Sequence, residues 1–429
     1  MVREGYKETE IGEIPVEWEV KSFSEACGRL LNGGTPNTQV PKYWDGSIPW
    51  ITGADVVNQK IENIRRYITE KAVEDSSTSV IPKECLLVVT RTGVGKLAIT
   101  PFDVAVSQDI TGVIPKTDYD IEYLFWVLNA SRNYFQNLTQ GTSINGITRN
   151  DLTQFKFAVP PLPEQRRIAA VLSTIDEAIE KTEALIAKLR QVKAGLMQDL
   201  LTKGIDEEGR VRSEETHAFK DSEIGRVPVE WEVALLNDLL EQTSQIIPER
   251  TPNRIFKYID VSSISRDALQ ISSFQEFKGK FAPSRARRLI KKDDIIFSTV
   301  RPYLKQISLV PEVFNGELCS TAFCVSRCDK SKLFYHFCFY YLTQDGFIRR
   351  VSRYESGSNY PAVLDKHIQN QVFPLPPLPE QHRIAAVLTA ADDRIAREEA
   401  YRDKLLAVKE GLMADLLAGR VRVPEGVAE

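Results

Sequence analysis

The chain carries the same helix-forming stretch twice, and this repeat limits its fold more than any other feature. The first copy reads FAVPPLPEQRRIAAVL from Phe157 and the second reads FPLPPLPEQHRIAAVL from Phe373, so that Glu164 and Glu380 lie 216 positions apart. Proline suits the first turn of a helix but not its interior. Because both copies then continue without Pro or Gly to a shared GLM triplet, each predicts one long helix.

The apolar residues of the first copy recur in alternating steps of four and three, which is the pattern of a coiled coil. The second copy keeps this seam at both ends and is polar in its middle, at Glu398 and Arg402. We expect the two helices to pair with each other, antiparallel or crossed, as a rod of roughly 40 residues and about 60 Å. The seam of the first copy comprises Ile168, Leu172, Ile175, Ile179, Thr182, Ile186, Leu189, Lys193, Leu196 and Leu200.

A second repeat, EIGEIPVEWEV from Glu10 and EIGRVPVEWEV from Glu223, precedes two segments of similar length and little shared sequence. The chain therefore looks like two fused half-molecules, whose variable segments would hang from opposite ends of the rod. The C-terminal tail also resembles the linker, which contains GRVR at 209–212. The predicted order is an N-terminal motif (1–20), the first variable segment (21–156), the first long helix (157–204), the linker with the repeated motif (205–233), the second variable segment (234–372), the second long helix (373–419) and a tail (420–429).

Both variable segments mix strand and helix signals, which predicts an α+β fold. In the first, IPWITGADV, ECLLVVTRTGVGKLAIT and ITGVIPK have strand character, and a helix follows over about 121–140. In the second, the strands are IFKYIDVSSI, DDIIFSTVRPYLKQISLV and STAFCVSR, and a helix follows over about 333–351. The same frame with different contents suggests two recognition segments built to one plan.

The net charge of −4 argues at first sight against nucleic acid as a partner, but the charge is unevenly distributed. Residues 21–160 carry 14 basic and 14 acidic side chains, whereas residues 234–373 carry 20 and 14. The acidity therefore belongs to the helices and their flanks. A neutral or basic segment beside an acidic scaffold is compatible with DNA binding, although a basic surplus is usually just a solvated face.

No motif for catalysis, metal binding or membrane insertion stands out. No apolar run is long enough for a membrane span and the N-terminus lacks a signal-peptide core, so we expect a cytoplasmic protein with free thiols. RTGVGK at 91–96 lacks the first Gly and the final Ser or Thr of a phosphate loop, and the four histidines support no catalytic triad. Buried thiols are favoured over zinc for a cluster without paired CxxC knuckles, formed by Cys319, Cys324, Cys328, His336 and Cys338.

Four sets of motifs together resemble the specificity subunit of type I DNA restriction and modification systems. They are PPLPEQRRIAAVL and PPLPEQHRIAAVL, the downstream KAGLMQDLL and KEGLMADLL, the stretch LNGGTPNTQVPKYWDGSIPWITGADV, and the pair IGEIPVEWEV and IGRVPVEWEV. The resemblance covers essentially the whole chain. It implies two target-recognition domains joined by two long helices, which together read a split, asymmetric sequence of double-stranded DNA.

The resemblance also implies partner subunits that carry the chemistry. Two modification (methyltransferase) subunits would hold S-adenosylmethionine and methylate adenine, and motor-nuclease restriction subunits would hold ATP and magnesium, so that this chain needs no cofactor and is not itself an enzyme. The residues alone leave two other classes open, a helical adaptor that joins two proteins without nucleic acid and a self-contained enzyme. A DNA reader must lose affinity as salt rises, an adaptor shows no such binding, and an enzyme is active as the purified chain.

DNA contacts require side chains that reach base edges or phosphates, and Arg is suited to guanine because it can donate two hydrogen bonds. For each candidate, a solvated surface role is the alternative. In the second variable segment, base contacts are predicted for Arg301, Tyr303, Ser358, Asn359 and Tyr360, and phosphate contacts for Arg285, Arg287, Arg288, Lys291, Lys292 and Lys305. In the first, the candidates are Thr35, Asn37, Thr38, Tyr43, Arg91, Thr92, Ser143 and Asn145 for bases and Lys96 for phosphate.

If the paired helices act as a spacer, their length sets the separation of the two DNA half-sites. Inserting Ala-Lys-Leu-Glu after Thr182 would add about 6 Å of helix, nearly two base pairs at about 3.4 Å each. Local unwinding can absorb an insertion of this length. The variant should fold, read the same half-sequences and prefer them about one or two base pairs further apart. Selection from a DNA library with randomised spacers measures this, and an unchanged preference in an active complex would contradict the ruler role.

Overall fold

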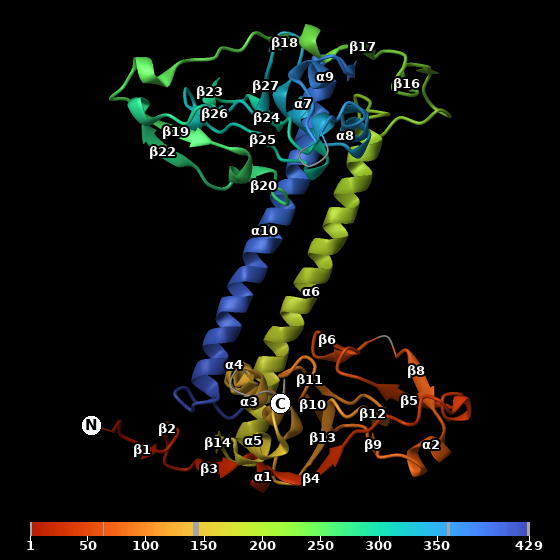
Figure 1. Cartoon of the computed structure of the whole chain (residues 1–429), viewed down its shortest axis with the longest axis vertical. Coiled ribbons are helices and arrows are strands. Elements are labelled where there is room, and N and C mark those ends of the chain that lie inside the picture. The colour runs from red at the N-terminus through yellow and green to blue at the C-terminus, as the bar shows by residue number, and fades with distance from the viewer. Residues whose placement is uncertain (1, 63, 140–145, 358–360, 427–429) are drawn as a thin grey trace. The chain divides into compact units, whose positions relative to one another are not determined.

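A computed structural model describes residues 2–62, 64–139, 146–357 and 361–426 of the chain (Figure 1). It divides into two compact units, each with one variable segment and part of both long helices. Unit 1 comprises Met1–Glu183 with Ala400–Glu429, and unit 2 comprises Ala184–Glu399. Of the helices in the described part of the chain, none combines the length and the apolar character that a membrane crossing requires.

Unit 1 is built on two four-stranded sheets, with strand orders β11-β10-β13-β4 and β8-β5-β12-β9 (Figure 1). The first sheet comprises β11 (Leu97–Ile99), β10 (Leu86–Val89), β13 (Ile110–Pro115) and β4 (Cys27–Asn32), and the second comprises β8 (Arg66–Ile68), β5 (Ile48–Ile51), β12 (Val104–Val106) and β9 (Ser79–Ile81). The smaller elements are β1 (Tyr6–Thr9), β2 (Gly12–Pro15), β3 (Glu19–Ser22), α1 (Phe23–Ala26), η1 (Pro41–Tyr43), β6 (Val56–Val57), β7 (Lys60–Ile61), α2 (Glu70–Glu74), α5 (Arg149–Gln154) and β14 (Lys156–Val159).

Unit 2 repeats this plan, with strand orders β25-β24-β27-β18 and β22-β19-β26-β23. In both units a single parallel pairing, β12 with β5 and β26 with β19, joins two strands of the second sheet. The matching topology confirms two domains built to one plan. The sheets comprise β25 (Ile307–Leu309), β24 (Ile295–Ser298), β27 (Phe323–Cys328) and β18 (Leu240–Glu241), then β22 (Gln275–Lys278), β19 (Ile255–Ile259), β26 (Leu318–Ser320) and β23 (Ala286–Leu289). The smaller elements are β15 (Phe219–Lys220), β16 (Val227–Pro228), β17 (Glu232–Leu235), η2 (Leu236–Leu239), η3 (Pro248–Arg250), η4 (Val261–Ser263), β20 (Ile264–Ser265), β21 (Gln270–Ile271), η5 (Gly279–Phe281), η6 (Pro302–Leu304), η7 (Glu312–Phe314), α9 (Asp365–Gln369) and β28 (Val372–Leu375).

Strand β10 shows how the layers arise from the sequence. Its four residues, LLVV, are apolar and all buried. Leu86 and Val88 belong to the core shared with helix α3 (Ile121–Ala130), whereas Leu87 and Val89 belong to the core shared with the second sheet. Successive side chains of a strand point to opposite faces, so a strand that is apolar throughout must be covered on both sides. Its counterpart β24 is buried in the same way.

The helices that follow the sheets are shorter than expected. The predicted helix over 121–140 is split into α3 and α4 (Arg132–Thr139), and the one over 333–351 into α7 (Tyr335–Leu342) and α8 (Asp345–Ser352). At each break a hydroxyl donates a hydrogen bond to a carbonyl of the preceding turn, Ser131 to Val127 (2.9 Å) and Thr343 to Tyr340 (2.8 Å). Because such bonds compete with the helical pattern, the prediction of single continuous helices is wrong.

The two long helices are α6 (Leu162–Leu200) and α10 (Leu378–Leu416), of 39 residues each. Each starts five residues after the Phe that opens the predicted segment. The reason is that the first residues of both predicted segments belong to strands, β14 paired with β3 and β28 paired with β17. Prolines separate strand from helix, since a residue before proline is disfavoured in helical conformation.

The long helices run antiparallel within each unit, which is one of the two expected arrangements (Figure 1). In unit 1 the start of α6 packs against the end of α10, through Ile168, Leu172 and Leu416. In unit 2 the end of α6 packs against the start of α10, through Leu200 and Ile384. Every position of the predicted α6 seam is buried or half-buried, which confirms the coiled-coil prediction.

A buried polar cluster in unit 2 brings three repeated sequences together at the start of α10. Glu380, from PLPEQ, is only 2% exposed. Its carboxylate accepts hydrogen bonds from Nε1 of Trp231 (3.2 Å), from the backbone N–H of Ile205 (3.0 Å) and from the guanidinium of Arg212, with which it forms an ion pair. Trp231 belongs to the PVEWEV motif and Arg212 to the GRVR segment of the linker. The linker therefore supplies the charge partner of the carboxylate at the start of α10.

Unit 1 contains the same cluster at the start of α6. Glu164, 3% exposed, accepts hydrogen bonds from Nε1 of Trp18 (3.1 Å) and from Nε (2.5 Å) and Nη2 (2.7 Å) of Arg422. Here the arginine comes from the C-terminal tail, which thus takes the place that the linker has in unit 2. Residues far apart in the sequence therefore complete each helix start.

Replacing Arg212 by Ala should lower the free energy of unfolding of unit 2 by about 3 kcal/mol, because it leaves the Glu380 carboxylate buried without its charge partner. Arg422→Ala should destabilise unit 1 less, since the Arg422 side chain is 41% exposed and that of Arg212 is 9% exposed. Urea unfolding followed by tryptophan fluorescence measures both. The control is Arg226→Ala, which removes an exposed ion pair with Glu214 and should change stability by less than about 0.5 kcal/mol. Equal losses for Arg212→Ala and the control would contradict this.

Candidate nucleic-acid interface

The turns predicted to touch DNA occupy equivalent places in the two units. Arg91, Thr92 and Lys96 lie in the turn between β10 and β11, and Arg301, Tyr303 and Lys305 lie in the turn between β24 and β25. Both turns join the central strand of the first sheet to its edge strand. Although the sequences differ, the fold therefore presents the two sets of candidates at the same position.

In unit 1 the turn is shaped by two glycines with positive φ, Gly93 (92°) and Gly95 (87°). Arg91 and Thr92 are exposed, while Nζ of Lys96 donates a hydrogen bond to the Gly53 carbonyl (3.1 Å). Lys96, predicted to touch phosphate, is thus engaged within the protein. The glycines let the turn form without strain and leave Arg91 and Thr92 as its exposed polar side chains.

The corresponding turn of unit 2 adopts left-handed backbone geometry without glycine. Arg301 has φ 49° and Lys305 has φ 51°, on either side of the short helix η6. Such conformations cost about 1 kcal/mol or more for residues with a side chain, and they cluster at functional sites. Two contacts stabilise the turn. The Arg301 N–H donates a hydrogen bond to the Pro361 carbonyl (2.8 Å), and Lys305 forms an ion pair with Asp345 (2.6 Å). Tyr303, at 52% exposure, projects from it.

Each turn is hydrogen-bonded to a residue that follows a predicted base-reading loop in the sequence. The Thr90 carbonyl accepts from the Ile147 N–H (2.8 Å), and the Thr299 carbonyl accepts from the Val363 N–H (2.9 Å). Ile147 follows the first predicted loop (141–146) directly, and Val363 lies two residues after the second (356–361). Thr90 and Thr299 therefore have equivalent partners in the two units. The loop candidates Ser143, Asn145, Ser358, Asn359 and Tyr360 themselves lie outside the described residues.

A third segment joins this edge in each unit. In unit 1 the Thr90 N–H donates to the Asp109 carbonyl (2.8 Å), and Oγ1 of Thr35 donates to Oε1 of the adjacent Gln108 (2.5 Å). In unit 2 the Thr299 N–H donates to the Ala322 carbonyl (2.8 Å), and the adjacent Thr321 N–H donates to the Arg285 carbonyl (2.9 Å). These hydrogen bonds link the segment of Thr35 to the Arg91 turn and the segment of Arg285 to the Arg301 turn.

Three candidates of unit 1 gather elsewhere, near the edge strand β8. Thr38 lines an open cavity of about 510 Å³ with Arg65 and Arg66. Asn37 is exposed, and the hydroxyl of Tyr43 donates to Oδ2 of Asp75 (2.8 Å). These residues form a second polar area, beside strand β8.

Sequence reasoning missed two arginines of unit 1 that border these areas. The Arg66 guanidinium lies 5.4 Å from the ring centre of Trp50 and is exposed. Nε of Arg132 donates to the Gly95 carbonyl (2.9 Å) and so supports the Arg91 turn. The WDGSIPW pair of tryptophans could have pointed to a partner for Arg66, whereas nothing in the sequence links Arg132 to Gly95.

The basic run at 285–292 does not form one free cationic face. Three of its five members are ion-paired, Arg287 with Glu249 (2.5 Å), Arg288 with Asp365 (2.5 Å) and Lys292 with Glu312 (3.2 Å). Arg285 and Lys291 are exposed and form no ion pair with any residue that the structure describes. Arg287 and Arg288 are neighbours on strand β23, so their side chains point to opposite faces of the sheet. Of the five residues predicted to contact phosphate in this run, Arg285 and Lys291 are therefore the two without an ion pair to any described residue.

The cysteines are buried free thiols. Burial raises the pKa of Cys324 to about 12, and that of Cys338 is raised by burial and by its hydrogen bond with Cys328. Such thiols stay protonated at neutral pH and pack as small apolar groups. Among the described residues, no three His, Cys, Asp or Glu side chains are grouped as a metal would require.

Replacing Arg287 by Ala should raise the pKa of Glu249, because hydrogen bonds from Arg287 hold it at about 2, below its ordinary value of 4.5. A depressed carboxyl pKa favours the folded state above about pH 4.5, and this contribution disappears as the pH falls through about 2. Carboxyl NMR of glutamate-labelled protein measures the titration. Lys292→Ala is the control and should leave Glu249 unchanged. A Glu249 pKa near 4.5 in the unsubstituted chain would show that Arg287 is not held by Glu249.

Comparison with known proteins places this arrangement in a family. The family model described as "Type I restriction modification DNA specificity domain" matches residues 15–191 and 228–407, one match for each half of the chain. The MjaIX specificity subunit of Methanocaldococcus jannaschii is 26% identical, with 98% of this chain and 97% of that protein covered. The EcoDI specificity subunit of Escherichia coli is 24% identical, with 92% and 84% covered.

Solved structures share the fold over nearly the whole chain. The S subunit of a type I restriction-modification system from M. genitalium aligns with a TM-score of 0.56 and 15% identity, covering 93% of this chain and 96% of that one. A chain from a structure of type I R-M complex assembly and conformational transition aligns with a TM-score of 0.55 and 18% identity, covering 95% and 99%. With two family matches on two equivalent units, the chain belongs to the family of type I restriction-modification DNA specificity subunits.

Proposed function

We propose that this specificity subunit reads a bipartite, asymmetric DNA sequence, with one part read by each unit. The observation that carries the proposal is the duplicated edge, where Thr90 and Thr299 join a turn, Ile147 or Val363, and a third segment through equivalent hydrogen bonds. The backbone hydrogen bonds of Thr90 and Thr299 are common to both units, whereas the turns and their side chains differ. A common frame with different side chains fits two readers of different sequences.

The side chains on the two edges suit different bases. For bases, unit 1 offers Arg91, Thr92 and Thr35, and unit 2 offers Arg301 and Tyr303, with Arg285 beside them for phosphate. Arginine can donate two hydrogen bonds to guanine, whereas threonine can bond to several bases or contact the thymine methyl group. Because the sets are not interchangeable, the two half-sequences should differ. The remaining cations, such as Lys291, would bind phosphate and make the affinity fall with salt.

The chemistry of restriction and modification would belong to partner subunits. The relatives are named specificity subunits of type I restriction enzymes, which fits a role in recognition within a larger complex. The proposal assigns S-adenosylmethionine to two modification subunits, and ATP and magnesium to motor-nuclease subunits. The adaptor alternative would require that the equivalent edges serve no nucleic acid, and it predicts no salt-dependent binding of duplex DNA by the assembled complex.

The matched variants Arg91→Ala and Arg301→Ala test the proposal. In the complex with its modification subunits, each should relax specificity at one or two positions in one half of the target only, at a cost of about 1–3 kcal/mol in binding. Sequencing of methylated sites, or selection from a randomised DNA library, identifies the affected positions.

Controls come from the opposite ends of the same central strands. Lys83 pairs with Glu84 before β10, and Lys330 pairs with Asp293 before β24. Lys83→Ala and Lys330→Ala should leave the recognised sequence unchanged. If Arg91→Ala altered both halves of the target, or neither, the assignment of one half to each unit would fail.

A further inference from the structure

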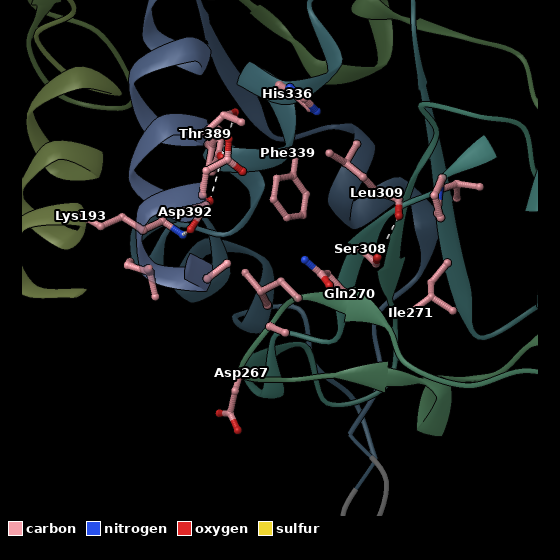
Figure 2. Close-up of a pocket in the computed structure, with 18 of the residues that line it drawn as sticks. Lys193, Asp267, Gln270, Ile271, Ser308, Leu309, His336, Phe339, Thr389 and Asp392 are labelled. Carbon is pink, nitrogen blue, oxygen red and sulfur yellow. Dashed lines mark hydrogen bonds and ion pairs between the residues drawn. The ribbon is translucent and has the colours of Figure 1, made fainter. Parts of the chain in front are cut away.

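Unit 2 contains a solvent-accessible cavity of about 640 Å³ that the DNA-reading edge does not use (Figure 2). Its walls come from α7, α10, α6, β25 and the turn between β20 and β21. Figure 2 shows Phe339 of α7 between the α10 residues Thr389 and Asp392 and the strand residue Leu309. A cavity of this size is in the range of small-molecule sites.

The charges that line the cavity are predominantly negative. Five carboxylates and two basic side chains border it. Both basic groups are already engaged, Arg190 with Glu399 (2.6 Å) and Lys193 with Asp392. Asp267 and Asp393 also line the cavity, and neither forms an ion pair with any residue in the described ranges. The cavity therefore has carboxylates left over for a cation.

Aromatic side chains form one wall of the cavity. They are Tyr335, His336, Phe339 and Tyr340, all from α7. Burial lowers the pKa of His336 below its ordinary 6.5, so the imidazole is neutral at neutral pH and adds no positive charge. The faces of aromatic rings attract cations, especially where carboxylates lie nearby. An aromatic wall beside unpaired carboxylates suits an organic cation better than a neutral or anionic ligand.

In unit 1, an ion pair lies at the place that corresponds to part of the cavity wall in unit 2. In the hairpin registers, Val57 pairs with Lys60 and Ser265 pairs with Gln270, so Gln270 is the counterpart of Lys60. The repeat offset of 216 between the long helices makes Ala396 the counterpart of Glu180. Lys60 and Glu180 form an ion pair in unit 1 (2.5 Å).

Neither partner of that ion pair is kept in unit 2. Gln270 and Ala396, which stand in their places, both line the cavity. The alkylammonium group that Lys60 provides in unit 1 is therefore missing in unit 2, together with one of its carboxylates, while other carboxylates and the aromatic wall are present. The internal repeat thus places an alkylammonium–carboxylate pair in unit 1 where unit 2 has the cavity.

We propose that the cavity of unit 2 binds a small aliphatic amine, such as a linear diamine or polyamine, with one ammonium group beside Phe339 and the carboxylates of α10. The proposal does not depend on DNA recognition. An alkylammonium could also come from a lysine of a partner subunit, and the experiment separates this source from a free amine.

The test uses the full chain and 1,5-diaminopentane as the probe, with heat of binding and NMR shifts as readouts. One amine should bind per chain, and binding should weaken as salt rises. Gln270→Lys combined with Ala396→Glu recreates the ion pair of unit 1 and should abolish binding. Asp393→Asn, a milder change, should weaken binding about tenfold.

Two controls check charge and position. The uncharged 1,5-pentanediol should not bind, and Asp221→Asn, which removes a 96% exposed carboxylate outside the cavity, should leave binding unchanged. Absence of binding at about 10 mM amine, or binding that persists in the Gln270→Lys/Ala396→Glu variant, would overturn the proposal. So would loss of amine binding when the chain is assembled with its modification subunits, because a side chain of the partner would then be the occupant.

Discussion

The buried carboxylate at the start of each long helix is the constraint on which the rest of the structure depends. A charge held at 2% or 3% exposure is tolerated only if it is paired and hydrogen-bonded, and Glu380 and Glu164 each receive a guanidinium and an indole N–H. These donors come from segments far away in the sequence. Satisfying one carboxylate therefore fixes the positions of the PVEWEV motif, the helix start and the GRVR segment together, which gives a physical reason for the three repeats.

The glutamine that follows each buried glutamate connects the long helix to the recognition segment of its unit. Oε1 of Gln165 accepts from the Asp120 N–H (2.9 Å) where α3 begins, and Oε1 of Gln381 accepts from the Phe334 N–H (2.8 Å) just before α7. The side-chain amide of each also donates to a proline carbonyl ahead of its helix, at 2.9 Å and 2.8 Å. The PEQ triplet thus joins a sheet-covering helix to a long helix in both units. A change in either residue would disturb the frame, whereas the turns can vary freely.

The sequence predicted the parts of the fold that depend on local patterns. The proline-led heptads predicted both long helices, and apolar runs such as LLVV predicted the strands. The basic residues between strand signals pointed to Arg91 and Arg301, which lie in equivalent turns. What it missed depends on distant partners. Glu249 and Asp365 lie 38 and 77 residues from the arginines they pair with, so the ion pairs that divide the basic run could not be anticipated. The helix breaks depend on single hydroxyl hydrogen bonds, which the apolar pattern does not reveal.

The two reading edges also differ in how their backbone is held. Unit 1 uses Gly93 and Gly95 for positive φ, which requires no strain, whereas unit 2 places Arg301 and Lys305 in left-handed geometry at about 1–2 kcal/mol each. Local contacts with Pro361 and Asp345 offset part of that cost. Both turns carry two cationic side chains, Arg91 and Lys96 in unit 1 and Arg301 and Lys305 in unit 2, but in unit 2 these residues themselves adopt the left-handed geometry. The buried ion pairs at the helix starts use none of the turn residues, so the turns can differ between the units while both units keep those ion pairs.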